Sequence, residues 1–143
     1  MASISANGSK GHHKFTLTLT EKSTSTENNT SNVEYSFKLS PVETSWNWEQ
    51  WGSDISYTIT INGTKYTGSI PNYDGYSTVT LKSGTQVVSH SADGSKSISY
   101  SFSVTDTTGQ SYTSGNASAS GTLALSTIPR ATTPTLSATS VTV

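Results

Sequence analysis

The sequence contains no cysteine, carries few charged residues and has no long apolar run. Without cysteine no disulfide can hold the fold together, so its stability has to come from packing and backbone pairing. The eight basic residues are scattered singly along the 143 residues, and seven of them are lysines. Such a distribution offers no basic stripe that would neutralise several phosphates, so we do not expect a nucleic-acid partner.

Apolar segments are too short for a membrane span, which needs roughly 20 consecutive apolar residues. Residues 1–11 also lack the apolar core of a signal peptide, so we expect no signal peptide and no membrane partner. The nine acidic residues and three histidines are dispersed, and the sequence shows neither a glycine-rich phosphate loop nor metal-ligand spacing. These shortages favour a protein that is not an enzyme and uses no cofactor.

Hydroxyl side chains are what the sequence has in excess, with 28 Ser and 25 Thr against 25 residues of Leu, Ile, Val and Phe together. A low aliphatic content accompanies disorder when the net charge is high, but here the net charge is −1. Seven Tyr, three Trp and three Phe supply additional bulk. We therefore predict a folded chain with a thin core, whose strands carry Ser and Thr on their solvent faces.

Apolar and polar residues alternate along most of the chain from Phe15 onward, which is typical of half-buried β-strands. Asn62-Gly63 lies between two such runs and predicts a two-residue hairpin turn, because both residue types accept a positive φ. Turn signals about every 8–12 residues favour an all-β fold, an antiparallel two-sheet β-sandwich that is either immunoglobulin-like or jelly-roll-like. About eight strands are expected, at residues 15–20, 33–39, 55–61, 64–70, 79–81, 86–90, 98–104 and 115–128, with a turn at Lys82-Ser83-Gly84.

The pattern divides the chain into three regions. Residues 1–12 are expected to form a flexible N-terminal entry, and residues 13–130 the β-sandwich domain. Residues 131–143 contain a proline and then a new alternating run, so they predict a linker and the start of a following β domain.

All three tryptophans lie within six residues, where exposed indoles could stack on the apolar faces of sugar rings. Tryptophan is more often largely buried, so packing in the core or at the end of the sandwich is the alternative. The candidate sugar site comprises the stacking residues Trp46, Trp48, Trp51, Tyr73 and Tyr76 and the polar partners Asn47, Glu49 and Gln50.

His90 and Asp93 are the residue types of a catalytic or metal-binding pair, but no third ligand accompanies them. We favour a structural interpretation in which Asp93 forms an Asx turn, Gly94 takes a positive φ and His90 hydrogen-bonds the loop backbone. For His12-His13 we expect a solvated entry to a strand.

Three further segments carry a resemblance to a known family. They are Asn28-Asn29-Thr30-Ser31-Asn32-Val33, His90-Ser91-Ala92-Asp93-Gly94-Ser95-Lys96, and residues 121–131 with their Ile-Pro-Arg exit. Together they resemble the minor structural and tail-associated proteins of tailed phages and prophages of Gram-positive bacteria, over residues 8–133. The resemblance carries no catalytic motif to this chain.

The resemblance implies a module of a phage tail or baseplate fibre built from serial β-sandwich domains. Its implied partners are other phage tail subunits and a host cell-wall glycan, with a homo-oligomer formed through the parent protein. The implied location is the virion tail, or the extracellular space after lysis. A carbohydrate-binding module that uses the aromatic cluster is the alternative function.

Overall fold

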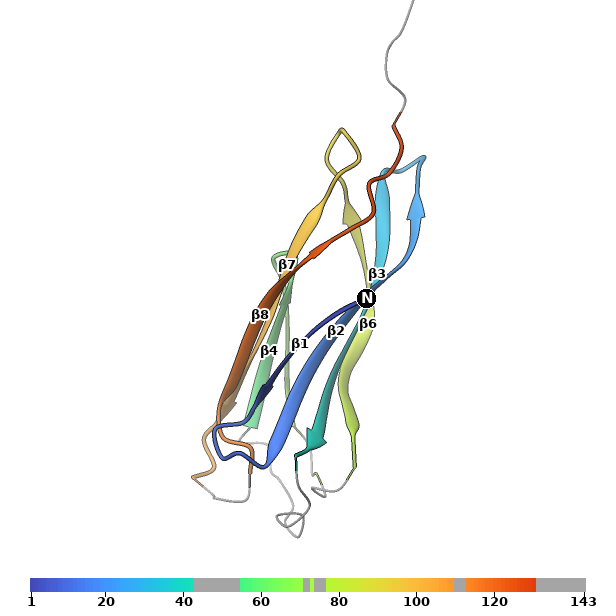
Figure 1. Cartoon of the computed structure of the whole chain (residues 1–143). Helices are drawn as coiled ribbons and strands as arrows, with labels where there is room; N and C mark the ends of the chain where they lie inside the picture. Colours follow the sequence, from blue (N-terminus) through green and yellow to red (C-terminus); the bar gives the residue numbers. More distant parts are fainter. Residues whose placement is uncertain (43–54, 71–72, 74–76, 110–112, 131–143) are drawn as a thin grey trace, which may run out of the picture.

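The computed structural model describes residues 1–42, 55–70, 73, 77–109 and 113–130, and in this part of the chain the regular elements are β-strands (Figure 1). Two antiparallel four-stranded sheets have the orders β1-β2-β3-β6 and β5-β4-β7-β8. The predicted all-β, two-sheet antiparallel sandwich is therefore confirmed. The strands are β1 (Ala2–Asn7), β2 (His13–Ser25), β3 (Thr30–Pro41), β4 (Ile55–Ile61), β5 (Thr64–Ser69), β6 (Val79–Ser89), β7 (Ser97–Asp106) and β8 (Ala117–Ala124).

The strand order is that of a Greek key. Strands β2 and β3, β4 and β5, and β7 and β8 pair as neighbours, whereas the chain changes sheet between β3 and β4, between β5 and β6, and between β6 and β7. This order corresponds to the A-B-E and C′-C-F-G sheets of immunoglobulin-like sandwiches, with β1 added beside the first strand. The immunoglobulin-like alternative thus describes the fold, and the jelly-roll alternative does not.

One core lies between the sheets and is filled by alternate residues of each strand. Phe37 at its centre lies 5.8 Å from Phe15 and 5.0 Å from Phe102, measured between ring centroids. The outward positions of the same strands are mainly Ser and Thr. The hydroxyl excess of the sequence is therefore explained by the solvent faces of the sheets.

Strand β6 runs without interruption from Val79 to Ser89, so the predicted turn at Lys82-Ser83-Gly84 is wrong. Gly84 pairs with Tyr35 of β3, and a Cβ at Gly84 would lie 2.7 Å from the Tyr35 hydroxyl oxygen. The glycine therefore makes room for a tyrosine ring, which the sequence alone could not distinguish from a turn.

Gly68 of β5 stands in the same relation to Tyr57 of β4, because a Cβ at Gly68 would lie 2.6 Å from the Tyr57 Cζ. The Tyr57 hydroxyl reaches across the sandwich and donates a hydrogen bond of 3.1 Å to the Leu81 carbonyl oxygen on β6. Two tyrosines lying over two glycines thus close the side of the sandwich between the edge strands β5 and β6.

The opposite side is closed by β1, which pairs with β2 over its whole length. The expectation of a flexible entry over residues 1–12 is therefore wrong for Ala2–Asn7. A Cβ at Gly121 of β8 would lie 2.8 Å from the Ile4 Cγ2, so β1 also packs closely on β8. Strand β8 ends at Ala124 rather than at 128, and residues 131–143 lie outside the described residues.

Candidate functional site

Four connections between strands leave from one end of the sandwich, at the bottom of Figure 1, which we call the loop end. They are the β1–β2, β3–β4, β5–β6 and β7–β8 connections, because the end of β1 lies beside the start of β2, the end of β3 beside the start of β6, and the start of β4 beside the end of β7. Loops at this end bind the ligand in antibody domains of the same architecture.

The predicted sugar-site residues all belong to two of these connections. Residues 46–51, which hold the three tryptophans, lie between β3 and β4, and Tyr73 and Tyr76 lie between β5 and β6. The strand ends that flank both connections lie at the loop end. Tyr73 is among the described residues, and Trp46, Asn47, Trp48, Glu49, Gln50, Trp51 and Tyr76 lie outside them.

The sequence predicted Tyr73 as an exposed stacking residue, but its side chain packs inside the protein. Its side chain is only 3% exposed, and its hydroxyl donates a hydrogen bond of 2.8 Å to the Ser77 carbonyl oxygen. The ring meets that of His13 edge to face, with centroids 5.7 Å apart. A ring buried in this way offers no face to a sugar.

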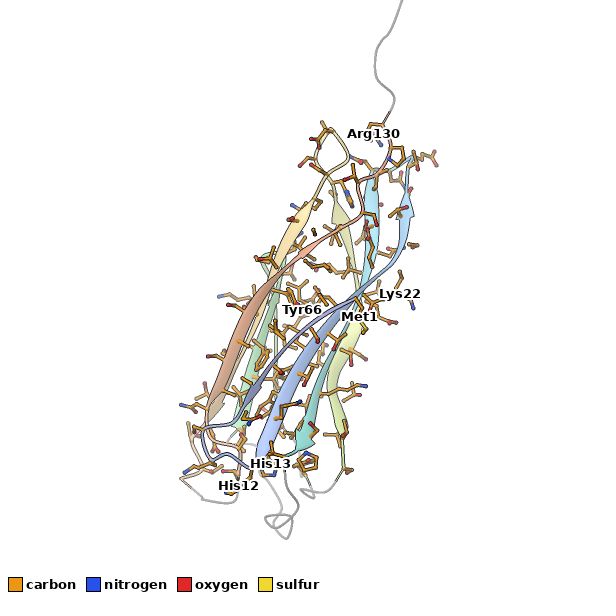
Figure 2. The ribbon with its side chains drawn as sticks, viewed as in Figure 1. Met1, His12, His13, Lys22, Tyr66 and Arg130 are labelled. Carbon is orange, nitrogen blue, oxygen red and sulfur yellow. The ribbon has the colours of Figure 1, made fainter. Side chains whose placement is uncertain are left out.

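His13 is fully buried at the loop end, so the expected solvated entry is wrong for this residue (Figure 2). It is the first residue of β2 and has the same parity as Phe15 and Leu17, which face the core. Parity within the strand is thus a sequence signal that would have predicted its burial.

Asp106 fixes the described parts of the β7–β8 connection. Its carboxylate accepts hydrogen bonds from the Thr108 N–H (2.9 Å) and hydroxyl (2.6 Å), the Thr113 hydroxyl (2.6 Å) and the Gly115 N–H (2.8 Å). Burial raises the pKa of Asp106, but these hydrogen bonds outweigh it and lower the pKa below its ordinary value. The ionised carboxylate therefore holds both ends of this connection.

The opposite end of the sandwich, at the top of Figure 1, contains a chain of hydrogen bonds that is buried at Ser31 and His90 and half-buried at Glu21. The Ser31 hydroxyl on β3 donates to the Glu21 Oε2 on β2 at 2.6 Å and lies 2.7 Å from the His90 Nε2. The His90 Nδ1 lies 2.7 Å from the Gly94 carbonyl oxygen and must donate to it, because a carbonyl oxygen only accepts. We call these four residues the Glu21–His90 network.

The turn between β6 and β7 confirms the structural interpretation of His90 and Asp93. The Asp93 carboxylate accepts hydrogen bonds from the Ser95 hydroxyl and N–H, which lower the pKa of Asp93. Gly94 has a φ of 89°, and His90 is bonded to the loop backbone as expected. Ser31 is 1% exposed, so its hydroxyl beside His90 is not open to a substrate.

Glu21 and Ser31 were not among the predicted site residues. Each occupies an inward position on its strand, Glu21 following Leu19 and Ser31 preceding Val33. A polar residue at a core position of an otherwise apolar run is the signal that would have identified them. Burial raises the pKa of Glu21, but hydrogen bonds from Ser31 and Ser126 and the charge of His90 outweigh it and lower the pKa.

Residues 125–130, which we call the exit segment, cross this end of the sandwich and are tied to it at several points. The Ser126 N–H and hydroxyl both donate to the Glu21 Oε1 at 2.9 Å, and the Ile128 N–H donates to the Gly94 carbonyl oxygen at 2.9 Å. The Arg130 guanidinium donates to the Thr26 carbonyl oxygen at 2.7 Å. We call this the exit end, because residues 125–130 are held against it.

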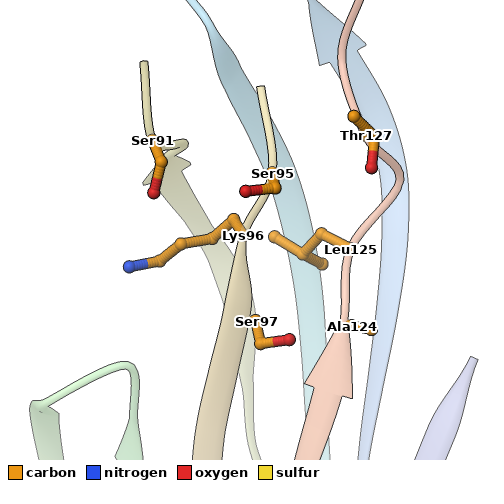
Figure 3. Close-up of a pocket in the computed structure, with 7 residues that line it drawn as sticks. All are labelled: Ser91, Ser95, Lys96, Ser97, Ala124, Leu125 and Thr127. Carbon is orange, nitrogen blue, oxygen red and sulfur yellow. The ribbon is translucent and has the colours of Figure 1, made fainter. Parts of the chain in front are cut away.

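A pocket of about 350 Å³ lies beside the exit segment (Figure 3). In Figure 3 the side chain of Lys96 extends on the side of Ser91, away from Leu125, and the Ser95 hydroxyl donates to Asp93. No aromatic ring is among its lining residues, so it has no surface on which a sugar would stack. The lining residues are Ser91, Ser95, Lys96, Ser97, Ala124, Leu125 and Thr127.

Among the residues that the structure describes, no group of three His, Cys, Asp or Glu side chains is placed to hold a metal ion. The same residues include no helix long and apolar enough to cross a membrane.

Comparison with known proteins gave one family. A family model described as "Siphovirus protein of unknown function (DUF859)" matches residues 1–142. Searches among curated proteins and among solved structures found no match. The phage association that the resemblance implied is therefore confirmed.

Proposed function

The chain belongs to this family of siphovirus proteins, and from that premise we propose that it is a non-catalytic module of a phage tail or baseplate structural protein that contributes to host-surface attachment. The observation that carries the proposal is the difference between the two ends of the sandwich. One end gathers four connections between strands, whereas the other holds residues 125–130 by hydrogen bonds.

The exit end suits a module in a series. Ser126 and Ile128 donate hydrogen bonds to different parts of the sandwich, and Ile128 is 1% exposed. A segment held in this way transmits the orientation of one domain to the chain that follows, whereas a free linker of polar residues would not. Its partners in this proposal are other tail subunits, and its location is the virion.

The loop end suits contact with a host surface, because residues 46–51 and Tyr76 belong to connections that leave from it. A second candidate function, a carbohydrate-binding module for cell-surface or cell-wall polysaccharide, rests on the same placement. Indole rings supply large apolar faces for sugar rings, and Asn47, Glu49 and Gln50 supply hydrogen-bonding groups beside them.

Binding of the purified, fluorescently labelled chain to intact host cells and to their isolated cell walls tests the proposal. We expect binding to cells of the host that the phage infects and none to a resistant strain. Absence of binding at high micromolar concentrations to every susceptible strain would overturn the attachment role.

The aromatic cluster is tested by Trp48→Ala, with Val87→Ala as the matched control at a 64% exposed position on β6. If the cluster binds sugar, Trp48→Ala abolishes cell-wall binding and moves the melting temperature by no more than a few degrees, while Val87→Ala binds normally. Unfolding of Trp48→Ala would instead show that the indole packs in the sandwich. Unchanged binding would show that Trp48 does not bind sugar, and it would leave the attachment role in place.

A further inference from the structure

The Glu21–His90 network and the exit segment together form a closed ring of hydrogen bonds. Within the network, Ser31 links Glu21 to His90, and His90 links onward to the Gly94 carbonyl oxygen. The exit segment donates to both ends of this chain, from Ser126 to Glu21 and from Ile128 to Gly94. The Ser31–His90 contact therefore lies at the centre of the hydrogen bonds that hold the exit segment.

Hydrogen counting shows that this ring needs one proton more than an ionised glutamate and a neutral histidine would supply. The His90 Nδ1 hydrogen is used by the Gly94 carbonyl, and the single Ser31 hydrogen is used by Glu21. A neutral His90 would then present a bare Nε2 to the Ser31 oxygen at 2.7 Å, with no hydrogen between two acceptors. Both ring nitrogens must therefore carry hydrogen, or Glu21 must itself be protonated.

We propose that the Glu21–His90 network is a proton-binding site, and that the proton it binds holds the exit segment against the sandwich. The proton resides on His90, because the Glu21 carboxylate accepts three hydrogen bonds and is thereby kept ionised. The site is an imidazolium and a carboxylate bridged by one hydroxyl.

Release of the proton breaks the ring at its centre. Ser31 then has one hydrogen for two acceptors, so either the Glu21 Oε2 or the His90 Nε2 loses its donor. Both His90 and Ser31 are buried, at 9% and 1% exposure, so water does not readily replace a donor that the His90 Nε2 loses, whereas the half-buried Glu21 carboxylate can accept one from water. We expect the exit segment to open more often in the deprotonated protein, and the joint to the chain that follows to become more flexible.

The other charged side chains on the elements around the network point to solvent or have their own partners. Asp93 is bonded to Ser95, and Arg130 to the Thr26 carbonyl oxygen. The half-buried Lys96 lines the pocket of Figure 3. Those on exposed positions of the neighbouring strands and turn are Lys22, Glu27 and Glu34.

Nitrogen-15 NMR of the histidine-labelled chain tests the proposal. With His90 assigned through its substitution by Gln, both of its ring nitrogens should show imidazolium shifts at pH 6. Between pH 6 and pH 9, opening measured by exchange of the Ser126 and Ile128 amides, corrected for intrinsic exchange, should increase about tenfold or more.

The Glu21→Gln variant tests whether the network depends on the bound proton or only has a structural role. A glutamine can donate its amide hydrogen to Ser31, which can then donate to a neutral His90, so this ring is complete without the additional proton. We expect its amide opening to be independent of pH between 6 and 9. Glu34→Gln, which removes an exposed carboxylate from β3, should retain the wild-type dependence.

Two results would overturn the proposal. One is a neutral His90 at pH 6 in the folded wild-type chain. The other is equal pH dependence of exit-segment opening in the wild type and in Glu21→Gln.

Discussion

Replacement of Gly68 by alanine is the sharpest test of how the sandwich is closed between β5 and β6. Gly68 does not have a positive φ, so alanine is compatible with its backbone. In a strand that merely contained a glycine, the substitution would stabilise the protein by about 0.5–1 kcal/mol. Here the new Cβ would lie 2.6 Å from the Tyr57 Cζ and 3.0 Å from its Cε2. Since relaxed carbon contacts are about 3.5–4.0 Å, the ring has to move by roughly 1 Å.

The cost of that movement has two parts. Overpacking of a core costs about 1–3 kcal/mol. Displacement of the ring also strains or breaks the hydrogen bond from the Tyr57 hydroxyl to the Leu81 carbonyl, for about 1 kcal/mol. After subtraction of the intrinsic preference for alanine, we expect a net loss of about 2 kcal/mol, or a decrease in melting temperature of roughly 7 °C.

Thermal and urea unfolding followed by circular dichroism measure the effect. Tyr57→Phe alone should cost about 1 kcal/mol, and the double variant should cost less than the sum, because the phenylalanine has no hydrogen bond to lose. Ser83→Ala, at an exposed position on β6, is the control and should change stability by less than about 0.5 kcal/mol. An increase in stability for Gly68→Ala would refute the close packing of Tyr57 on Gly68.

Three further predictions concern the exit end and the acid limit of stability. Ser31→Ala should destabilise the fold by about 2 kcal/mol in urea unfolding at pH 7, because the buried His90 ring and the half-buried Glu21 carboxylate lose their partner. A loss below about 0.5 kcal/mol would contradict this. Gly94→Ala should cost more than Gly63→Ala, because both glycines have a positive φ but only a Cβ at Gly94 meets the Ile128 carbonyl oxygen; equal losses in stability would argue against this contact. The pKa values of Glu21 and Asp106 are lowered in the folded state, so the native protein binds fewer protons, and the stability they contribute is present at neutral pH and is lost as pH falls below about 4. In Asp106→Asn, the unfolding midpoint should decrease less between pH 6 and pH 2 than it does in the wild type. An equal decrease would show that Asp106 does not contribute to the loss of stability in acid.

Alternation was sufficient to predict most strands and the sandwich. It predicted β4 and β5 around the Asn62-Gly63 turn, where Asn62 has a φ of 50° and Gly63 of 83°. It failed at Gly84, because a glycine beneath a tyrosine ring and a glycine in a turn look the same in one sequence. It also failed at β1, whose single large apolar residue, Ile4, gives little periodic signal.

The candidate site was predicted less completely than the fold, for a physical reason. His90 and Asp93 are neighbours in the sequence, and their turn follows from local chemistry. The ring of hydrogen bonds that includes His90 also takes residues from β2, β3 and the exit segment, and its Ser126–Glu21 bond joins residues 105 positions apart. Only the pairing of β2 with β3 and of β3 with β6 brings them together, and the sequence does not specify that pairing.

The location of the chain in the virion tests the central claim most directly. Purified siphovirus particles that encode this chain can be labelled with Fab fragments raised against the purified domain and imaged by electron microscopy, with mass spectrometry of the same particles. We predict that the chain is a component of the particle, that the Fab marks the tail or baseplate, and that it blocks adsorption to host cells. Absence of the chain from purified particles, or labelling confined to the head, would contradict the account.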